Sequence, residues 1–349
     1  MQTLFLIVLM ASELCYYLLV AQTGIIESFG SDLSKVFTLP LGGAIGSLIA
    51  HRNFGPLNTT RRKIAFLLVA QTLLSLTYPN FNLITLFLLG LTVGALAPLF
   101  IYLFSKDEIL PLMIALICAY GTGTALFTSP PEGRGTIAVL LSLLALAAVG
   151  GLRRDEKAAE TEPHTRLQLT PCGAAVLFLW VALDSSLFEI LSRHDSMSIW
   201  RGEFWPFIIL FHTLGLLTAY VVRNRFKYHH SAIALLFGLS YALLFFEQDM
   251  LLSMVYPFVI SYYNFFLLRL LVSIRSLQLL GVCMLGAGWI ASGLGLMVAL
   301  NHLSLIPVAV LFIGFTISLL SEGAVTFGRQ KKAPVDKKIV LRHGKWQVE

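Results

Sequence analysis

Two acidic residues, Glu13 and Asp184, lie deep inside long apolar stretches of the sequence. An ionisable side chain at the centre of a bilayer costs several kcal/mol, so it normally faces a cavity or a partner. Tyr16 and Tyr17 follow Glu13 at helical spacing, and Trp180 precedes Asp184 by one turn. Carboxylates beside aromatic faces are suited to bind a cation and to carry a proton. The pattern predicts an acidic, aromatic-lined cavity for a cationic or protonatable substrate.

Other polar residues inside apolar stretches extend this set of candidates. His212 lies near the middle of one stretch, and Tyr262, Tyr263 and Asn264 cluster in another, with Arg269 nearer its end. A simpler interpretation of these residues stays open. In it, each acid is neutral and hydrogen-bonded, or pairs with His212 or Arg269. His212 would in that case be a structural residue, and Arg269 would reach the inner headgroups. In a second functional hypothesis the acids serve only the proton, while His212 and Arg269 hold an anion.

The composition indicates a membrane protein. Of 349 residues, 57% are hydrophobic and 13% are charged, and the mean hydropathy is +0.79. A soluble globule of this size cannot hide so much apolar surface, which excludes a soluble enzyme, a nucleic-acid-binding domain and a disordered chain. The sequence also shows no phosphate-binding loop, HExxH helix or GxSxG elbow. We therefore expect no enzyme activity, no metal and no other cofactor.

A membrane-spanning helix needs about 20 mostly apolar residues. The sequence has stretches of this kind at residues 3–26, 34–51, 63–79, 82–104, 108–128, 134–152, 172–192, 203–222, 229–246, 250–271, 276–299 and 304–324. We expect an all-α polytopic membrane protein with about twelve transmembrane helices and very short loops.

The basic residues predict the orientation of these helices. If the N-terminus is cytoplasmic, then Lys35, Arg134, Arg193 and Arg201 fall outside, and the rest of the 25 Lys and Arg residues fall inside. Cytoplasmic loops carry such an excess of basic residues. Both termini are therefore predicted to be cytoplasmic, and the net charge of +6 reflects orientation rather than a nucleic-acid partner.

The chain shows signs of an internal duplication. A shift of 171 residues superimposes Ala11 on Ala182, Glu13 on Asp184, and the pair Arg52-Asn53 on Arg223-Asn224. The most hydrophilic interior stretch separates six spans from six. The predicted organisation is an N-terminal half (1–152), a cytoplasmic loop (153–170), a C-terminal half (171–326) and a basic cytoplasmic tail (327–349).

Two parallel six-helix repeats resemble the major facilitator superfamily. The signature of that family lies between its second and third spans, and this chain has Gly46-Ser47-Leu48-Ile49-Ala50-His51-Arg52-Asn53-Phe54-Gly55 there, followed by Arg61-Arg62-Lys63. The resemblance implies a gating loop that contains Gly46, Arg52, Arg61 and Arg62. It also implies that spans one, four, seven and ten line a central cavity, with Glu13 facing Asp184. Ala50 replaces the Asp that helps to latch the cytoplasmic side in the family.

These observations predict a secondary active transporter that works by alternating access. The favoured substrate is an organic cation or amine, exported in exchange for protons across a bacterial inner membrane by a monomer. Its partners are then a small molecule, protons and the lipid bilayer. Two alternatives stay open: transport of an anionic metabolite or siderophore-like chelate by the same fold, and a non-transporting assembly or lipid-handling protein.

Overall fold

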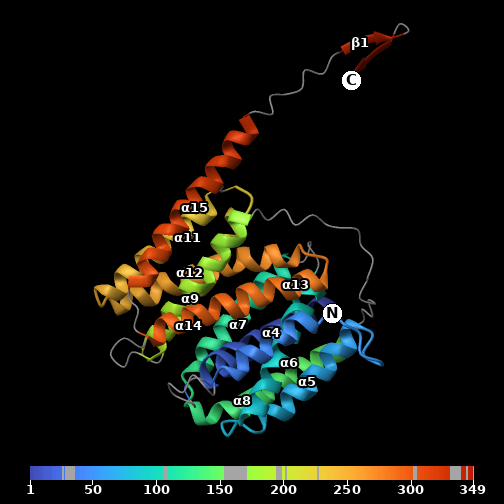
Figure 1. Ribbon diagram of the computed structural model, residues 1–349, viewed down its shortest axis with the longest axis vertical. Helices are drawn as coiled ribbons and strands as arrows, with labels where there is room; N and C mark the ends of the chain where they lie inside the picture. The colour runs from blue at the N-terminus through green and yellow to red at the C-terminus, as the bar shows by residue number, and fades with distance from the viewer. Residues whose placement is uncertain are drawn as a thin grey trace.

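The protein is a bundle of long helices (Figure 1). The computed structural model describes residues 1–25, 27, 36–104, 109–152, 171–193, 199–200, 203–225, 228–301, 305–330, 339–342 and 345–348. The predicted central loop at 153–170 lies outside these residues, as do Lys35 and Arg201.

Each predicted span corresponds to a helix within the described residues. The helices are α1 (Gln2–Tyr16) with its π-helical continuation η1 (Tyr17–Gly24), α4 (Thr38–Ile49), α5 (Thr60–Ser75), α6 (Leu83–Leu103), α7 (Ile109–Phe127), α8 (Arg134–Gly151), α9 (Pro171–Arg193), α10 (Trp205–Val222), α11 (His229–Phe245), α12 (Asp249–Val272), α13 (Leu277–Met284) with η3 (Leu285–Ala291) and α14 (Ser292–Leu300), and α15 (Leu305–Gln330). A short 3-10 turn, η2 (Pro131–Gly133), precedes α8.

Length and composition show a multi-pass integral membrane protein. Eight helices among the described residues are long and apolar enough to cross a bilayer, and Thr38–Ile49, His229–Phe245 and Ile306–Leu320 are shorter apolar helices. In the tail, β1 (Ile339–Arg342) pairs antiparallel with β2 (Lys345–Val348), a hairpin that was not expected from the sequence.

Local sequence signals set several helix starts. The Thr59 side chain accepts a hydrogen bond from the backbone N–H of Arg62 at the start of α5. Asn82 and Thr85 form a reciprocal capping box at the start of α6, with both bonds 2.8 Å long. Such caps satisfy N–H groups that the first turn of a helix leaves without partners.

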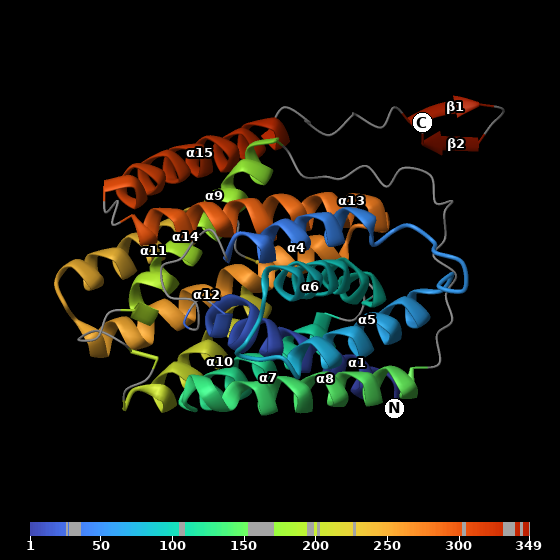
Figure 2. The same ribbon diagram turned by 60° about the horizontal axis from the view of Figure 1, so that its bottom comes forward.

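Glycines bring α4 and α6 into backbone contact. A Cβ atom on Gly42 or Gly46 would lie 2.1 Å from a carbonyl oxygen of α6, and one on Gly90 or Gly94 would lie 2.0–2.1 Å from a carbonyl oxygen of α4. Lipid gives no hydrophobic drive for helix association, so close packing of this kind holds membrane helices together. Figure 2 shows the two helices side by side.

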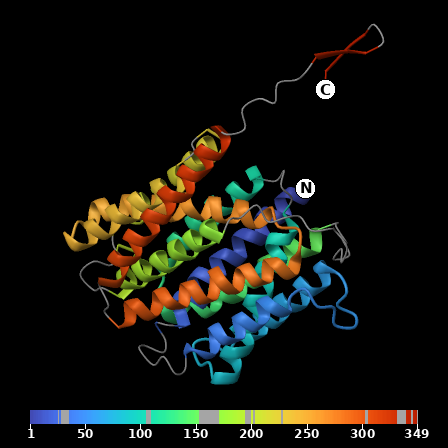
Figure 3. The same cartoon turned by 45° about the horizontal axis from the view of Figure 1, so that its top comes forward.

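The helix contacts repeat with a shift of six spans. We call α1 to α8 the N-terminal helices and α9 to α15 the C-terminal helices. The contacts of α1 with α7 and α8, of α4 with α6, and of α5 with α6 and α8 recur as contacts of α9 with α14 and α15, of α10 with α12, and of α11 with α12 and α15. This pattern agrees with the duplication inferred from the sequence. Figure 3 shows α15, in red, on the outside of the bundle.

The two sets of helices meet along two seams. At one seam α4 contacts α13 and η3, and at the other α7 contacts α10. These seams are related by the same shift of six spans. A cavity that Glu13 and Asp184 both line lies between the two sets of helices.

Candidate functional site

A cavity of about 260 Å³ lies between the N-terminal and C-terminal helices. Glu13 and Asp184 both line it, so the structure brings the two acids into the wall of one cavity. The helices α1, α6, α9 and α12 contribute lining residues, as the family resemblance implied, and α7, α10 and η3 contribute more. Within the described part of the chain, the lining contains no lysine or arginine.

Glu13 is held by an amide behind the cavity wall. Its side chain is 6% exposed. The Gln71 amide on α5 donates from Nε2 to both carboxylate oxygens of Glu13, at 3.0 and 3.2 Å. The same amide lies 3.1 Å from Oγ of Ser142 on α8. Glu13 therefore joins α1 to two neighbouring helices while it faces the cavity.

Asp184 is held by two tyrosine hydroxyls. The hydroxyl of Tyr256 lies 2.8 Å from Oδ1 and 2.9 Å from the carbonyl oxygen of Asp184, so its one proton is shared between them. The hydroxyl of Tyr263 donates to Oδ2 at 2.5 Å. The two tyrosines are seven residues apart on α12, which places them two turns apart on one helix face. Tyr263 also lines the cavity. The carboxylate thus has a hydroxyl donor on each oxygen and a fixed orientation.

Tyr120 connects the two sets of helices across the cavity. Its ring, on α7, stacks on the ring of His212, on α10, with centroids 4.5 Å apart and planes within 4°. The Asn264 amide on α12 donates to the Tyr120 hydroxyl at 2.8 Å. His212 Nδ1 lies 2.7 Å from Oγ of Ser261. His212 and Asn264 line the cavity, as does Tyr17 on η1.

Two of the predicted cavity residues face neighbouring helices instead. Tyr16 is fully buried, and its hydroxyl is 2.8 Å from Oγ of Ser75 on α5. Trp180 is also fully buried, stacks on Phe237 of α11 with ring centroids 6.0 Å apart, and lies against Gly314 of α15. Adjacent residues on a helix differ by about 100° in direction, so Tyr17 faces the cavity and Tyr16 does not.

Tyr262 and Arg269 also lie away from the cavity lining. The Tyr262 hydroxyl is 2.9 Å from Nδ1 of His229 on α11. Arg269 donates to the carbonyl oxygen of Arg223 at 3.1 Å and to Oδ1 of Asn224 at 3.0 Å. This guanidinium therefore binds the carbonyl end of α10, where helix termini attract cations.

The predicted gating loop is a set of contacts at the ends of α4, α5 and α8. Gly46 packs against α6, and Arg52 is exposed beyond the end of α4. Arg61 donates to the carbonyl oxygen of Gly150 at 2.9 Å. Arg62 lies 3.4 Å from Oδ1 of Asn58. Lys63 donates to the carbonyl oxygen of Ala50 at 3.2 Å, so the backbone at Ala50 contacts a basic residue although the side chain carries no acid.

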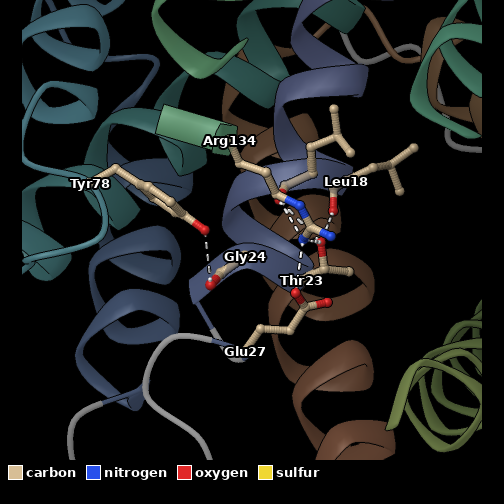
Figure 4. A network of polar contacts seen from close by, with 7 residues as sticks. Leu18, Thr23, Gly24, Glu27, Tyr78 and Arg134 are labelled. Atoms are coloured by element: carbon tan, nitrogen blue, oxygen red, sulfur yellow. Dashed lines mark hydrogen bonds and ion pairs between the residues drawn. The ribbon is translucent and has the colours of Figure 1, made fainter. Parts of the chain in front are cut away.

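A buried arginine was not among the predicted site residues. Arg134 was counted among the outer basic residues, at the start of the predicted span 134–152; it is the first residue of α8 and is fully buried. Its guanidinium lies 3.2 Å from Glu27 and 3.2 Å from Oγ1 of Thr23, and packs 4.7 Å from the ring centre of Phe127. Figure 4 shows this side chain directed into the last turns of η1.

Gln71, Tyr120, Tyr256 and Trp289 were also missed as site residues. In the sequence, each of these four is only a polar or aromatic residue inside an apolar segment. Such a residue does not reveal which side chain it contacts. Trp289, on η3, lines the cavity and donates from Nε1 to Oγ of Ser47 at 3.0 Å. Among the described residues, no group of three or more His, Cys, Asp or Glu side chains is placed to hold a metal ion.

Comparison with protein-family models found no match, and comparison with curated proteins found none either. Solved structures do match over nearly the whole chain. A bacterial homologue of the iron transporter ferroportin, in its outward-facing state, is 14% identical with a TM-score of 0.55, over 95% of this chain and 98% of that one. The major facilitator superfamily transporter FucP, in the outward conformation, is 12% identical with a TM-score of 0.57, over 92% and 99%.

The chain has a divergent major facilitator superfamily fold. At these identities the similarity is one of fold. It agrees with the predicted all-α, multi-pass architecture and with the paired helix contacts described above. What this fold does in the present chain depends on the cavity residues.

Proposed function

We propose that this protein is a secondary transporter that works by alternating access and moves an organic cation or amine. The observation that carries the proposal is the cavity between the two sets of helices. Glu13 and Asp184 line it, and no lysine or arginine occurs among its described lining residues. An anionic cavity in a low-dielectric surrounding favours a positively charged ligand.

The aromatic lining supports an organic cation. Rings of Tyr17, Tyr120, Tyr263 and Trp289 border the same cavity as the acids. A cation over an aromatic face gains about 0.5–2 kcal/mol, and the larger value applies where water is excluded. Most other lining residues are aliphatic or phenylalanine side chains, which fit the carbon skeleton of an organic molecule better than a hydrated inorganic ion.

Transport of an anionic substrate is the second candidate function. In that hypothesis His212 and Arg269 together bind the anion. His212 lines the cavity, but Arg269 binds backbone and side-chain oxygens at the end of α10. His212 and Arg269, which were expected to bind the anion together, therefore lie in two different places, the cavity lining and the end of α10. This separation favours the cation.

Proton coupling and export complete the proposal. A membrane potential that is negative inside draws a cation inward by about 2.3 kcal/mol per charge per 100 mV. Uptake of a cation needs no further energy source under that potential, whereas export does. Exchange for inward-moving protons supplies this energy, and a carboxylate in the cavity is a group that carries a proton. A bacterial inner membrane and a monomer fit this proposal.

The test is a transport assay in proteoliposomes with an imposed pH gradient. The panel contains tetraphenylphosphonium, benzyltrimethylammonium, citrate and ferric citrate. We expect gradient-driven movement of a cation that is lost in Glu13→Gln and in Asp184→Asn. Arg269→Gln is the matched control, because its side chain lies away from the cavity lining, and it should keep cation flux.

Three results would overturn this assignment. Normal cation flux in both acid variants would show that the acidic cavity is not the route. Movement confined to citrate or ferric citrate, and lost in His212→Ala, would favour the anionic alternative. Lack of movement for the whole panel in the wild-type protein would favour the non-transporting alternative.

A further inference from the structure

The two acids occupy equivalent positions in the repeat but have different neighbours. Glu13 on α1 and Asp184 on α9 superimpose when the sequence is shifted by 171 residues, and both line the cavity. The same shift places Thr85 and Thr92 of α6 on Tyr256 and Tyr263 of α12. The hydroxyl pair that holds Asp184 therefore has no aromatic counterpart at Glu13.

The donors at Asp184 stabilise a charged carboxylate in one orientation. Each oxygen accepts a hydrogen bond from a different tyrosine hydroxyl, at 2.8 and 2.5 Å. Hydrogen bonds to an ionised acceptor are shorter and about twice as strong as neutral ones. A proton on this carboxyl group would compete with the two hydroxyl protons for the same oxygens. The arrangement thus favours the ionised form of a carboxylate that faces the cavity.

The hydrogen bond to Glu13 is compatible with both the charged and the protonated carboxyl group. One amide nitrogen, Nε2 of Gln71, serves both oxygens at 3.0 and 3.2 Å and is shared with Ser142. A proton on either oxygen leaves the other oxygen free to accept the amide N–H. The carboxyl group can therefore gain or lose a proton without breaking the contact between α1 and α5.

The groups around Asp184 also differ in kind from those around Glu13. Five tyrosines from four elements lie within electrostatic reach of Asp184: Tyr17 of η1, Tyr120 of α7, Tyr241 of α11, and Tyr256 and Tyr263 of α12. Near Glu13 the titratable neighbour is Tyr16, with the neutral side chains of Gln71 on α5 and Ser142 on α8. Cation-binding aromatic groups therefore gather at the second acid.

We propose that the two acids have separate tasks: Asp184, positioned by Tyr256 and Tyr263, binds the positive group of the substrate, and Glu13 carries the coupling proton. This inference rests on the proposed function and goes further, because it assigns the binding site for the positive group of the substrate to the C-terminal helices. Tyr256 and Tyr263 are positioning residues that act through Asp184.

A binding experiment separates the two tasks. Tritiated tetraphenylphosphonium is titrated onto the purified full-length protein, and its uptake into proteoliposomes is measured in parallel. Asp184→Asn should abolish binding. Tyr263→Phe should raise Kd and KM about tenfold or more and leave the maximal rate close to that of the wild type. Glu13→Gln should keep Kd within about threefold and lose the response of uptake to the pH gradient.

The adjacent Tyr262→Phe variant is the matched control, because the Tyr262 hydroxyl contacts His229 on α11 rather than Asp184. It should bind like the wild type. Loss of binding in Glu13→Gln together with normal binding in Tyr263→Phe would overturn the proposed division. Lack of probe binding by the wild-type protein would contradict the proposed function itself.

A second measurement tests the division without any substrate. Infrared difference spectra between about pH 5 and pH 9 report the C=O stretch of protonated carboxylic acids in the membrane. We expect a titrating band that disappears in Glu13→Gln and persists in Asp184→Asn. A band that persists in the first variant and disappears in the second would reverse the assignment, and no titrating band in the wild type would exclude Glu13 as the proton carrier.

Discussion

At the scale of single residues, the acids are identifiable from sequence and their partners are not. An acid inside a long apolar segment is conspicuous, so Glu13 and Asp184 could be selected, and both line the cavity. Gln71 gave no comparable signal, because a polar side chain in a span does not reveal which helix it contacts. Tyr16 and Tyr17 differ by one residue, and only the rotation of α1 in the bundle decides which of them faces the cavity.

The Gln71–Glu13 contact should contribute measurably to stability. Gln71→Leu removes the amide that donates to both oxygens of Glu13. Loss of the donor to a buried acceptor costs about 1–3 kcal/mol, so the melting temperature in detergent should fall by several degrees. Gln278→Leu is a control at an exposed glutamine and should have little effect. Equal melting temperatures for the two variants would contradict the role given to this contact.

The buried Arg134 gives a second prediction at this scale. Arg134→Leu removes the bonds to Glu27 and Thr23 and should cost about 3–5 kcal/mol, as for one partner of a buried ion pair. The double variant with Glu27→Leu should recover part of that loss, because an apolar pair of similar volume often substitutes well. Denaturation monitored by tryptophan fluorescence measures both. A double variant no more stable than the single one would argue against coupling of the two charges.

At the scale of elements, hydropathy predicted the helices well. Their exact packing needed the tertiary structure. The sequence has two pairs of glycines at a spacing of four, Gly42 with Gly46 and Gly90 with Gly94, and only the structure shows that they form one interface. The tail hairpin was missed because Ile339–Val348 has no turn signal beyond a single glycine.

The α4–α6 interface should not tolerate one added methyl group. A Cβ on Gly46 would lie 2.1 Å from the carbonyl oxygen of Leu91, so Gly46→Ala must separate the two helices. We expect a loss of about 1–3 kcal/mol or failure to fold, by overpacking. Gly238→Ala is the matched control, because a Cβ there meets nothing within 4 Å. If thermal melts in detergent show equal stability for the two variants, the close approach of α4 and α6 is wrong.

At the scale of the whole molecule, alternating access requires contacts between the two sets of helices to break. Trp289 on η3 donates to Ser47 on α4, and Ser47 donates to the carbonyl oxygen of Gly94 at 2.9 Å. Gly281 also packs against the backbone of Ser47. Ser47 lies near the end of α4 that precedes Arg52. The sequence could not reveal this seam, because contacts across the repeat follow from the fold and leave no local pattern.

Weakening this seam should separate the ends of α4 and α13. Spin labels at His51 and Gln278 report the distance between the ends of α4 and α13, in a background without the native cysteines. Trp289→Phe removes the hydrogen bond to Ser47 and should shift the distance distribution to longer values. Trp205→Phe, at a side chain that is 44% exposed, is the control. An unchanged distribution for Trp289→Phe would show that this contact does not hold the seam closed.

The most direct test of the account is whether cation movement and proton movement are linked through the acidic cavity. Proteoliposomes with a pH-sensitive dye inside receive tetraphenylphosphonium outside, with the membrane potential clamped. We expect proton release from the lumen as the cation enters, at equal rates in the wild type and in Arg269→Gln. We expect no proton movement in Glu13→Gln and no movement of either species in Asp184→Asn. Cation entry in the wild type without proton release, or proton release that persists in Glu13→Gln, would contradict the proposed exchange.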